Sequence, residues 1–561
     1  MRRLWHIVFV LALIFSWCVS AWAQTKRLPD VTSTEGREFF VAWLPNGGSN
    51  PQDLDLKLQL MASSRKANRI RVEYANGSSE DYNIGANRTV TILIDPQSVY
   101  WDSGKEEEEK PLSKGIRVYS LNDELFTLYS TNQIGVTGSY SFDGAHILPV
   151  EALGTEYIVQ TAEADATATE FLIMSTKTGQ TNVSINLKVN SRRGNTQQLS
   201  VTLDGPKQIY IVRSKAPNPE DPNDFIDLSG STICADQPIA VWSGNQYAII
   251  PYKDGYSNDH AYDQLLPINQ WGKEFIVPTT ACHTALNFMR IVAMQDNTTV
   301  TIKRGAATSS VSLNAGQTSF QRLNIDVNNP QNATRKVTSD KPIQVYLYST
   351  SAGANTWYDD DGNDHVPSDP STTLIPPLEF LTDTTIFRTF TAGDGQLEHK
   401  MNIWALTSQV NNIKLDGQSI GGQFTQVASD TRYSQAYITL TDTTHVITAP
   451  KKCFTGYAYG MNDGQAYLYP IGYDFTPKQD SLFLLDNDNK YLVHWSEWKD
   501  KAVSQTEGGW YLDKKLLDNG NYLLDSTFVC DKTTLTLPIK TYEAWYKVRW
   551  EIEGAIQGAD Y

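Results

Sequence analysis

The chain carries the stretch Gly36-Arg37-Glu38-Phe39-Phe40-Val41, and two close copies of it follow. They are Gly154-Thr155-Glu156-Tyr157-Ile158-Val159 and Gly272-Lys273-Glu274-Phe275-Ile276-Val277, so that the copies begin 118 residues apart, at positions 36, 154 and 272. Recurrence at a fixed interval is the signature of a repeat architecture. The spacing predicts tandem structural units of about 110–118 residues.

A second motif follows each copy of the first motif along the chain. Its copies are Asn122-Asp123-Glu124-Leu125-Phe126, Ala235-Asp236-Gln237-Pro238-Ile239, Ser339-Asp340-Lys341-Pro342-Ile343 and a diverged Pro450-Lys451-Lys452-Cys453-Phe454. Proline cannot donate to a β ladder, and an aspartate before it can close a turn, so we interpret this Asp-x-Pro-Ile motif as a recurring strand entry. We interpret the glutamate of the first motif as a structural residue rather than a catalytic acid.

Between the motifs, apolar and polar residues alternate with period two, as in Asn297–Lys303 and Asn182–Leu187. This alternation is typical of half-buried strands, and turn pairs such as Asn76-Gly77, Asp204-Gly205 and Asp416-Gly417 separate them. The sequence therefore predicts an all-β chain of three to four tandem sandwich-like β repeats and a small C-terminal β module.

Residues 1–23 read as a signal peptide. Arg2 and Arg3 precede an apolar run, and Ala21-Trp22-Ala23 supplies small residues for cleavage after Ala23. The protein is thus expected to be secreted or held at the cell surface, without a transmembrane helix. The predicted boundaries are 24–147, 148–265, 266–374 and a diverged 375–473 for the repeats, then 474–561 for a C-terminal module that looks truncated.

Composition narrows the class of protein. The net charge is −16, which argues against a nucleic-acid partner because phosphate contacts need a basic surface. After the signal segment four cysteines remain, and in an oxidising compartment they allow three disulfide pairings that the sequence does not distinguish: Cys234, Cys282, Cys453 and Cys530.

Loops that differ between the repeats are the candidates for recognition. Equivalent loops span 132–146, 245–264 and 351–369, and they combine polar with aromatic residues. The candidate ligand-binding residues are Tyr247, Tyr252, Tyr256, Tyr262, Trp357 and Tyr358. Packing of these rings over the ends of the sandwiches is the alternative.

One stretch resembles a metal site. Asp359, Asp361 and Asp364 surround a glycine turn and could bind Ca²⁺ through carboxylate oxygens, and a solvated acidic loop is the alternative. His146, His260 and His365 recur once per repeat and are expected to make loop hydrogen bonds. Gly417-Gln418-Ser419-Ile420-Gly421 fits the G-x-S-x-G pattern, but it follows a strand and reads as a hairpin, not as a nucleophile elbow.

The motifs together resemble the IgGFc-binding protein N-terminal domain family over about residues 33–473. The matching segments are Thr34–Ala42, Leu148–Tyr157, Ala235–Asn245, Asp263–Pro267, Trp271–Phe275, Arg290–Ala293, Asp369–Ser371 and Ile375–Pro377. This resemblance implies an extracellular binding or adhesion module rather than an enzyme. It supplies no site residue and leaves immunoglobulin binding open.

The tail from Phe528 looks like the start of the PKD-like or Ig-like modules of exported Bacteroidota proteins, and short Asp-Ser/Thr triplets fit the glycosylation signal of that phylum. We therefore expect a cell-surface protein that binds a host or envelope protein or a glycan. Two alternatives stay open: a carbohydrate-active enzyme with carboxylates between repeats, and a purely structural stalk.

Overall fold

The computed structural model describes most of the chain from residue 33 onward. The described ranges are 33–47, 55–101, 105–136, 139–161, 168–215, 226–251, 258–281, 286–325, 329–351, 357–358, 364–365, 369–391, 397–462 and 465–475, followed by short strands between 481 and 557. The predicted signal peptide lies outside these residues. Within them, no helix is long and apolar enough to cross a membrane.

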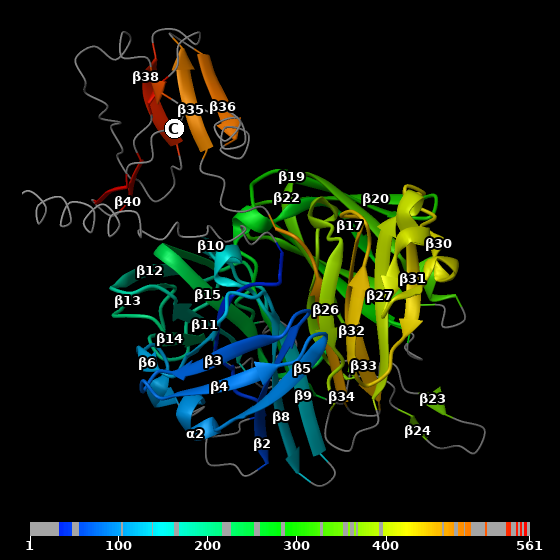
Figure 1. The fold of residues 1–561 in the computed structure, drawn as a ribbon, viewed down its shortest axis with the longest axis horizontal. Helices are drawn as coiled ribbons and strands as arrows, with labels where there is room; N and C mark the ends of the chain where they lie inside the picture. Colours follow the sequence, from blue (N-terminus) through cyan, green and yellow to red (C-terminus); the bar gives the residue numbers. More distant parts are fainter. Residues whose placement is uncertain are drawn as a thin grey trace, which may run out of the picture. The chain divides into compact units, whose positions relative to one another are not determined.

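The first repeat consists of two four-stranded antiparallel sheets (Figure 1). One sheet has the order β1 (Glu38–Val41), β7 (Ile116–Ser120), β3 (Asn68–Tyr74) and β4 (Ser79–Ile84). The other has the order β5 (Arg88–Ile94), β2 (Leu56–Ser64), β8 (Thr127–Val136) and β9 (Ser139–Ile147). A four-residue helix, α2 (Pro96–Val99), and the turn η1 (Lys105–Glu107) follow β5.

In the second and third repeats one long strand belongs to both halves of the sandwich. In the second repeat it is β15 (Thr232–Ala248), which pairs with β10 (Gly154–Ile158), β12 (Thr181–Asn186), β11 (Thr169–Ser175) and β16 (Asp259–Gln264). Two further strands extend the sheet: β13 (Gln198–Leu203) and β14 (Gln208–Arg213). β14 also pairs with β6 (Leu112–Ser113). In the third repeat the long strand is β22 (Arg335–Tyr348), which pairs with β17 (Gly272–Val277), β19 (Thr298–Arg304), β18 (Leu286–Ala293) and β25 (Thr372–Ile375), while β20 (Ala307–Leu313) and β21 (Thr318–Asn324) extend the sheet.

The fourth repeat returns to two separate sheets. They are β26 (Thr384–Arg388), β32 (Thr444–Thr448), β28 (Lys414–Leu415) and β29 (Gln418–Ser419), and then β30 (Thr425–Gln426), β31 (Tyr433–Thr439), β27 (Glu398–Leu406), β33 (Phe454–Asn462) and β34 (Gln465–Gly472). β33 starts at the diverged fourth motif and pairs with β27 and β34, as β8 pairs with β2 and β9 in the first repeat. β28 and β29 pair across Asp416-Gly417, which confirms that the G-x-S-x-G stretch is a hairpin.

The C-terminal segment also forms strands. Antiparallel β35 (Ser481–Asp486) and β36 (Asn489–His494) are joined by β38 (Thr534–Ile539), which is parallel to β35. Two further pairs are β37 (Tyr511–Leu512) with β39 (Tyr546–Lys547), and β40 (Trp550–Ile552) with β41 (Ala555–Gln557). The predicted fold class, all-β with sandwich-like repeats and a C-terminal β module, is confirmed, whereas the domain boundaries stay a prediction.

The Asp-x-Pro-Ile motif is not a strand entry in the second and third repeats, and that prediction is wrong there. The proline lies inside β15 or β22, where the pairing register of the neighbouring strand shifts: Gly154 pairs with Ile239 but Glu156 with Cys234. β17 shifts against β22 in the same way. The irregularity leaves the proline outside the ladder, so its missing N–H costs no hydrogen bond, and the long strand can pass from one half of the sandwich to the other.

The glycine of the first motif marks the contact between successive repeats. A Cβ added to Gly36, Gly154 or Gly272 would lie 2.2, 2.5 or 2.3 Å from the Cβ of Pro149, Pro267 or Pro377 of the following repeat. Each proline precedes a short 3₁₀ turn: η2 (Val150–Ala152), η3 (Ile268–Gln270) or η5 (Leu378–Phe380). Glycine thus permits a close approach that recurs at each junction.

The four repeats close into a cycle. β9 contacts β16 and β34, and β25 contacts both β16 and β34, so the last strands of the four repeats meet one another. We call these four strands the hub. The first and fourth repeats also join through Thr34, whose N–H donates to the Tyr473 carbonyl at 3.0 Å and whose hydroxyl accepts from the Tyr473 N–H at 3.3 Å.

Cysteine pairing differs from the expectation. Cys453 is fully buried as a free thiol, burial raises its pKa to about 11, and the described residues contain no disulfide. Cys282 and Cys530 lie outside the described residues. A framework in which all four cysteines are bonded is therefore not present, and the stability of the repeats rests on their buried cores and on the contacts between them.

Candidate binding site

Each repeat contributes a hairpin whose second strand belongs to the hub. β9 and β16 run in the same direction, because Ser141 hydrogen-bonds Asp259 near their starts and the Leu148 N–H donates to Gln264 Oε1 near their ends. β9 and β34 also run together: the ring of Phe142 lies 6.2 Å from that of Tyr467, and His146 lies 6.4 Å from Tyr473.

β25 follows the same direction. Its Leu374 N–H donates to Asp263 on β16 at 3.1 Å, while Ser371, just before β25, donates to Asp143 on β9 at 2.9 Å. The connections into the four hub strands therefore lie at one end of the cycle. We call this end the hairpin-end face; it comprises the connections β8–β9, β15–β16, β22–β25 and β33–β34.

The structure describes parts of two of the predicted aromatic loops, and these parts belong to the connections β15–β16 and β22–β25. Tyr247 is half-buried near the end of β15, and its hydroxyl donates to the Gly47 carbonyl of the first repeat. Trp357 and Tyr358 form the short strand β23 (Trp357–Tyr358), which pairs with β24 (Asp364–His365) in the connection between β22 and β25 (Figure 1). Tyr252 and Tyr256 lie outside the described residues.

Tyr262 is not an exposed ring. It lies on β16 with no solvent exposure, and its hydroxyl is 2.9 Å from that of Ser130 on β8. The second half of the predicted loop 245–264 is this strand, whose six residues are all buried between neighbouring repeats. A strand enclosed on both sides by polar partners shows no period-two alternation, and for that reason the sequence pattern suggested a loop.

The structure describes only one of the three aspartates that were predicted to bind Ca²⁺. Asp364 belongs to β24, while Asp359 and Asp361 lie outside the described residues. Among the residues that the structure does describe, no three His, Cys, Asp or Glu side chains are grouped to hold a metal ion. His146 stacks on Tyr129 at 4.7 Å and His260 on Tyr262 at 4.9 Å, so these two recurring histidines pack against rings.

Buried aspartates form the floor beneath the hairpin-end face, and each ties two or more repeats together. Asp259 Oδ1 accepts from the Ser141 hydroxyl at 2.5 Å and from the Phe142 and His260 N–H groups at 2.9 and 2.7 Å. Asp143 accepts from the Tyr262 N–H at 3.1 Å as well as from Ser371. These acids give the hub a fixed hydrogen-bonded arrangement.

Burial determines the protonation state of the hub aspartates and of the two histidines beside them. It raises the pKa of Asp143 and Asp259 well above the usual range, with the charge of Asp369 adding to the rise for Asp259, and it raises the pKa of Asp263 to about 7. Burial also lowers the pKa of His146 and of His260 to about 3, so both rings are neutral at pH 7. The floor therefore carries little charge near neutrality.

Asp263→Asn is expected to remove part of the pH dependence of stability. The folded chain holds the Asp263 proton up to about pH 7, and the unfolded chain releases it near the ordinary value of about 3.9. The contribution of Asp263 is thus fully present below about pH 4 and is lost as the pH rises through about 7, by up to about 4 kcal/mol.

Urea unfolding of the wild type and Asp263→Asn at pH 5 and pH 8 measures this loss. The asparagine variant should gain stability relative to the wild type on going from pH 5 to pH 8. Asp81→Asn is the matched control, because Arg71 lowers the pKa of this exposed acid and it stays ionised at both pH values. An equal Asp263→Asn effect at both pH values contradicts the assignment.

Residues that precede the second motif of a repeat, such as Glu108 and Asp227, form contacts between repeats. Glu108, in the acidic run of the first repeat, is fully buried and forms ion pairs with Arg192 and Arg213 of the second. Asp227 of the second repeat pairs with Arg290 of the third at 2.8 Å. These residues therefore provide charged contacts between repeats, which leaves the hairpin-end face as the better candidate for recognition.

Comparison with known proteins gives one family. The family model described as IgGFc binding protein matches residues 143–460, more than half of the chain. The human IgGFc-binding protein is 26% identical over 470 residues, an alignment that covers 80% of this chain and 8% of the human protein. The chain thus spans less than a tenth of the length of this curated relative.

Solved structures show only faint similarity. A Ca²⁺-stabilised ice-binding adhesin of an Antarctic bacterium is 11% identical, with 79% of this chain and 99% of that chain covered and a TM-score of 0.10. A family 32 glycoside hydrolase of Bifidobacterium adolescentis is 8% identical, with 79% and 97% covered and a TM-score of 0.14. At these TM-scores neither carries an argument, whereas the match over 143–460 does: the chain belongs to the IgGFc-binding protein family.

Proposed function

We propose that this chain is an exported binding protein that recognises an extracellular protein through its hairpin-end face. The observation that supports the proposal is the direction of the hub strands, which brings four hairpin connections of different sequence to one end of a rigid β framework. Variable loops on a rigid scaffold are the usual place for recognition. Family membership adds weight, since the human relative is named for binding IgG Fc.

Within this surface we assign contact to the aromatic residues Tyr247, Tyr252, Tyr256, Trp357 and Tyr358. Tyrosine and tryptophan combine a large apolar ring with a polar group and dominate the energetics of protein interfaces. Tyr262 is left out because it is buried. Ca²⁺ held by Asp359, Asp361 and Asp364 would order the connection that carries Trp357 and Tyr358.

The enzyme alternative lacks a site among the described residues. The buried aspartates of the hub accept hydrogen bonds from backbone N–H groups, and the described pocket has no carboxylate in its lining. A glycosidase needs two carboxyl groups that flank a substrate cleft. The proposal therefore favours binding over catalysis, and places the protein outside the cell, at the surface of an exporting bacterium.

The test is binding of residues 24–561 to human IgG Fc and to a glycan array, each with and without EDTA. Saturable binding to Fc that weakens at least tenfold on Trp357→Ala supports the proposal, and loss in EDTA supports the calcium assignment. Tyr82→Ala on β4, an outer strand of the first repeat, is the control and should leave binding unchanged. Binding to glycans alone, or to neither, contradicts the assignment of a protein partner.

A further inference from the structure

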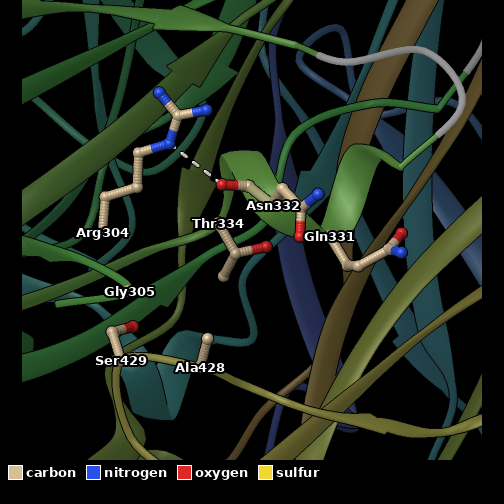
Figure 2. Close-up of a pocket in the computed structure, with 7 residues that line it drawn as sticks. All are labelled: Arg304, Gly305, Gln331, Asn332, Thr334, Ala428 and Ser429. Carbon is tan, nitrogen blue, oxygen red and sulfur yellow. Dashed lines mark hydrogen bonds between the residues drawn. The ribbon is translucent and has the colours of Figure 1, made fainter.

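A small pocket opens between the third and fourth repeats, at the far end of β22 from its hairpin (Figure 2). It has a volume of about 230 Å³. It is lined by Arg304 at the end of β19 and the next residue Gly305, by Gln331, Asn332 and Thr334 at the turn η4 (Pro330–Ala333), and by Ala428 and Ser429 before β31. All of its polar side chains are neutral or cationic. The lining thus offers hydrogen-bond donors and a positive charge without a carboxylate.

Two arginines carry positive charge at or next to this pocket: Arg304 lines it, and Arg335 follows the lining residue Thr334 in the chain. Arg304 is exposed, and its Nε donates to the Asn332 carbonyl at 3.0 Å. Arg335, the first residue of β22, is largely buried and donates to the Ala333 carbonyl. Neither forms an ion pair with an acid among the described residues, and burial together with the charge of Arg304 lowers the pKa of Arg335 to about 10.

The nearby acids are already engaged. Lys336 Nζ lies 2.6 Å from Glu274 and 3.4 Å from Asp430, and Arg432 lies 2.7 Å from Asp430. In a chain with a net charge of −16, two neighbouring guanidinium groups without a described carboxylate partner are unusual. An arginine placed in this way attracts an external anion and can bind a carboxylate with two parallel hydrogen bonds.

A third group points to a ligand. Ser429 lines the pocket, and its buried hydroxyl has no hydrogen-bond partner among the residues that the structure describes. The Thr334 hydroxyl donates to Gln435 Oε1 at 2.7 Å, so it can only accept from a ligand. Ser429 is therefore left to donate, and the amides of Gln331 and Asn332 can bind hydroxyl groups next to an anion.

We propose that this pocket binds an acidic sugar, with the sugar carboxylate on Arg304 and the Ser429 hydroxyl and the sugar hydroxyls on Gln331 and Asn332. The volume suits a single sugar unit, and the mixture of one charged fork with amides and hydroxyls matches a polyhydroxylated anion better than an apolar ligand. The site lies at the opposite end of β22 from the hairpin-end face, so it is independent of the function proposed above.

Isothermal titration of residues 24–561 with glucuronic acid and with N-acetylneuraminic acid at pH 7 tests the proposal, with galactose as the uncharged probe. At least one acid should bind saturably and galactose should not. Arg304→Ala should weaken that binding at least tenfold, and Ser429→Ala should weaken it severalfold. Arg322→Ala is the matched control, since Arg322 is an exposed arginine of the same repeat whose Nε donates to Asn324, and it should bind as the wild type does.

Three results would overturn the assignment: no saturable binding of either acid, wild-type binding by Arg304→Ala, or equal weakening by Arg322→Ala. Inorganic sulfate that binds as tightly as the sugars would reduce the site to a general anion site and refute the sugar. Circular dichroism of each variant shows that the fold is retained, and because Arg304 is exposed its replacement removes no core packing.

Discussion

Arg213→Ala should lower the free energy of unfolding by about 3–5 kcal/mol, because it leaves the carboxyl group of Glu170 buried without the cation that pairs with it and leaves Glu108 with one of its two described cations, Arg192. Arg213 is 1% exposed, its Nε lies 2.5 Å from Glu170, and its Nη1 lies 3.7 Å from Glu108 of the first repeat. Both carboxyl groups have no solvent exposure. The guanidinium also lies 4.8 Å from the ring centre of the buried Trp101, so packing is lost as well as charge.

Protonation of Glu170 should soften this loss at low pH. Burial raises the pKa of Glu170 to about 7, and Arg213 is the main influence that lowers it. Without Arg213 the acid is neutral over a wider range, so the loss in Arg213→Ala should be smaller at pH 5.5 than at pH 8. Urea unfolding at both pH values measures this difference.

The partner variants separate charge from packing. Arg213→Met/Glu170→Met should lose less stability than Arg213→Ala, since it removes the Arg213 and Glu170 charges together, fills the space with apolar groups and leaves Glu108 paired with Arg192. Lys66→Ala, which breaks an exposed pair with Glu124, should change stability little. A loss in Arg213→Ala no larger than that of Lys66→Ala would contradict the account.

Gly272→Ala should destabilise the chain by about 1–3 kcal/mol through overpacking. The added Cβ would lie 2.3 Å from Pro377 Cβ and 2.8 Å from Pro377 Cγ and Glu379 Oε2. Gly272 does not have a positive φ, so the substitution introduces no backbone strain, and its cost reports the contact between the third and fourth repeats. Thermal and urea unfolding measure the change.

Gly205→Ala is the control for this effect. A Cβ there meets no atom within 4 Å, and Gly205 likewise has no positive φ. It should be neutral or slightly stabilising, since alanine reduces the entropy of the unfolded chain. Equal effects of the two substitutions would mean that the recurring glycine does not mark a close contact between repeats.

Short sequence motifs and turn residues correctly predicted several strands and hairpins. The glycine motif predicted three repeats, the diverged fourth motif is β33, and Asp416-Gly417 forms the predicted hairpin. These features depend on neighbours in sequence, namely alternation along a strand and positive φ at a turn such as Gly417, at 81°. Glu38 and Glu274 of the first motif pair with Arg117 and Lys336, which confirms their structural role.

The hub could not be predicted because its cause lies between repeats. Asp259–Gln264 is polar and reads as a loop, yet it is a buried strand because β9 and β25 satisfy its carboxyl groups. One signal was present: an aspartate shortly before the proline segment in successive repeats, at Asp143, Asp259 and Asp369. The role of this aspartate depends on the contact between the hub strands of different repeats, and that contact cannot be predicted from the sequence of one repeat.

Closure of the first repeat on the fourth is the central claim, because it brings all four hairpins to one face. Ser33 and Asp474 form an antiparallel bridge across this junction, and such partners are close enough for a disulfide. In Ser33→Cys/Asp474→Cys we expect mild oxidation to yield a monomer with an intramolecular bond between residues 33 and 474, identified by peptide mass spectrometry and absent from each single variant. Intermolecular bonds only, or no bond between these positions, would contradict the closed cycle.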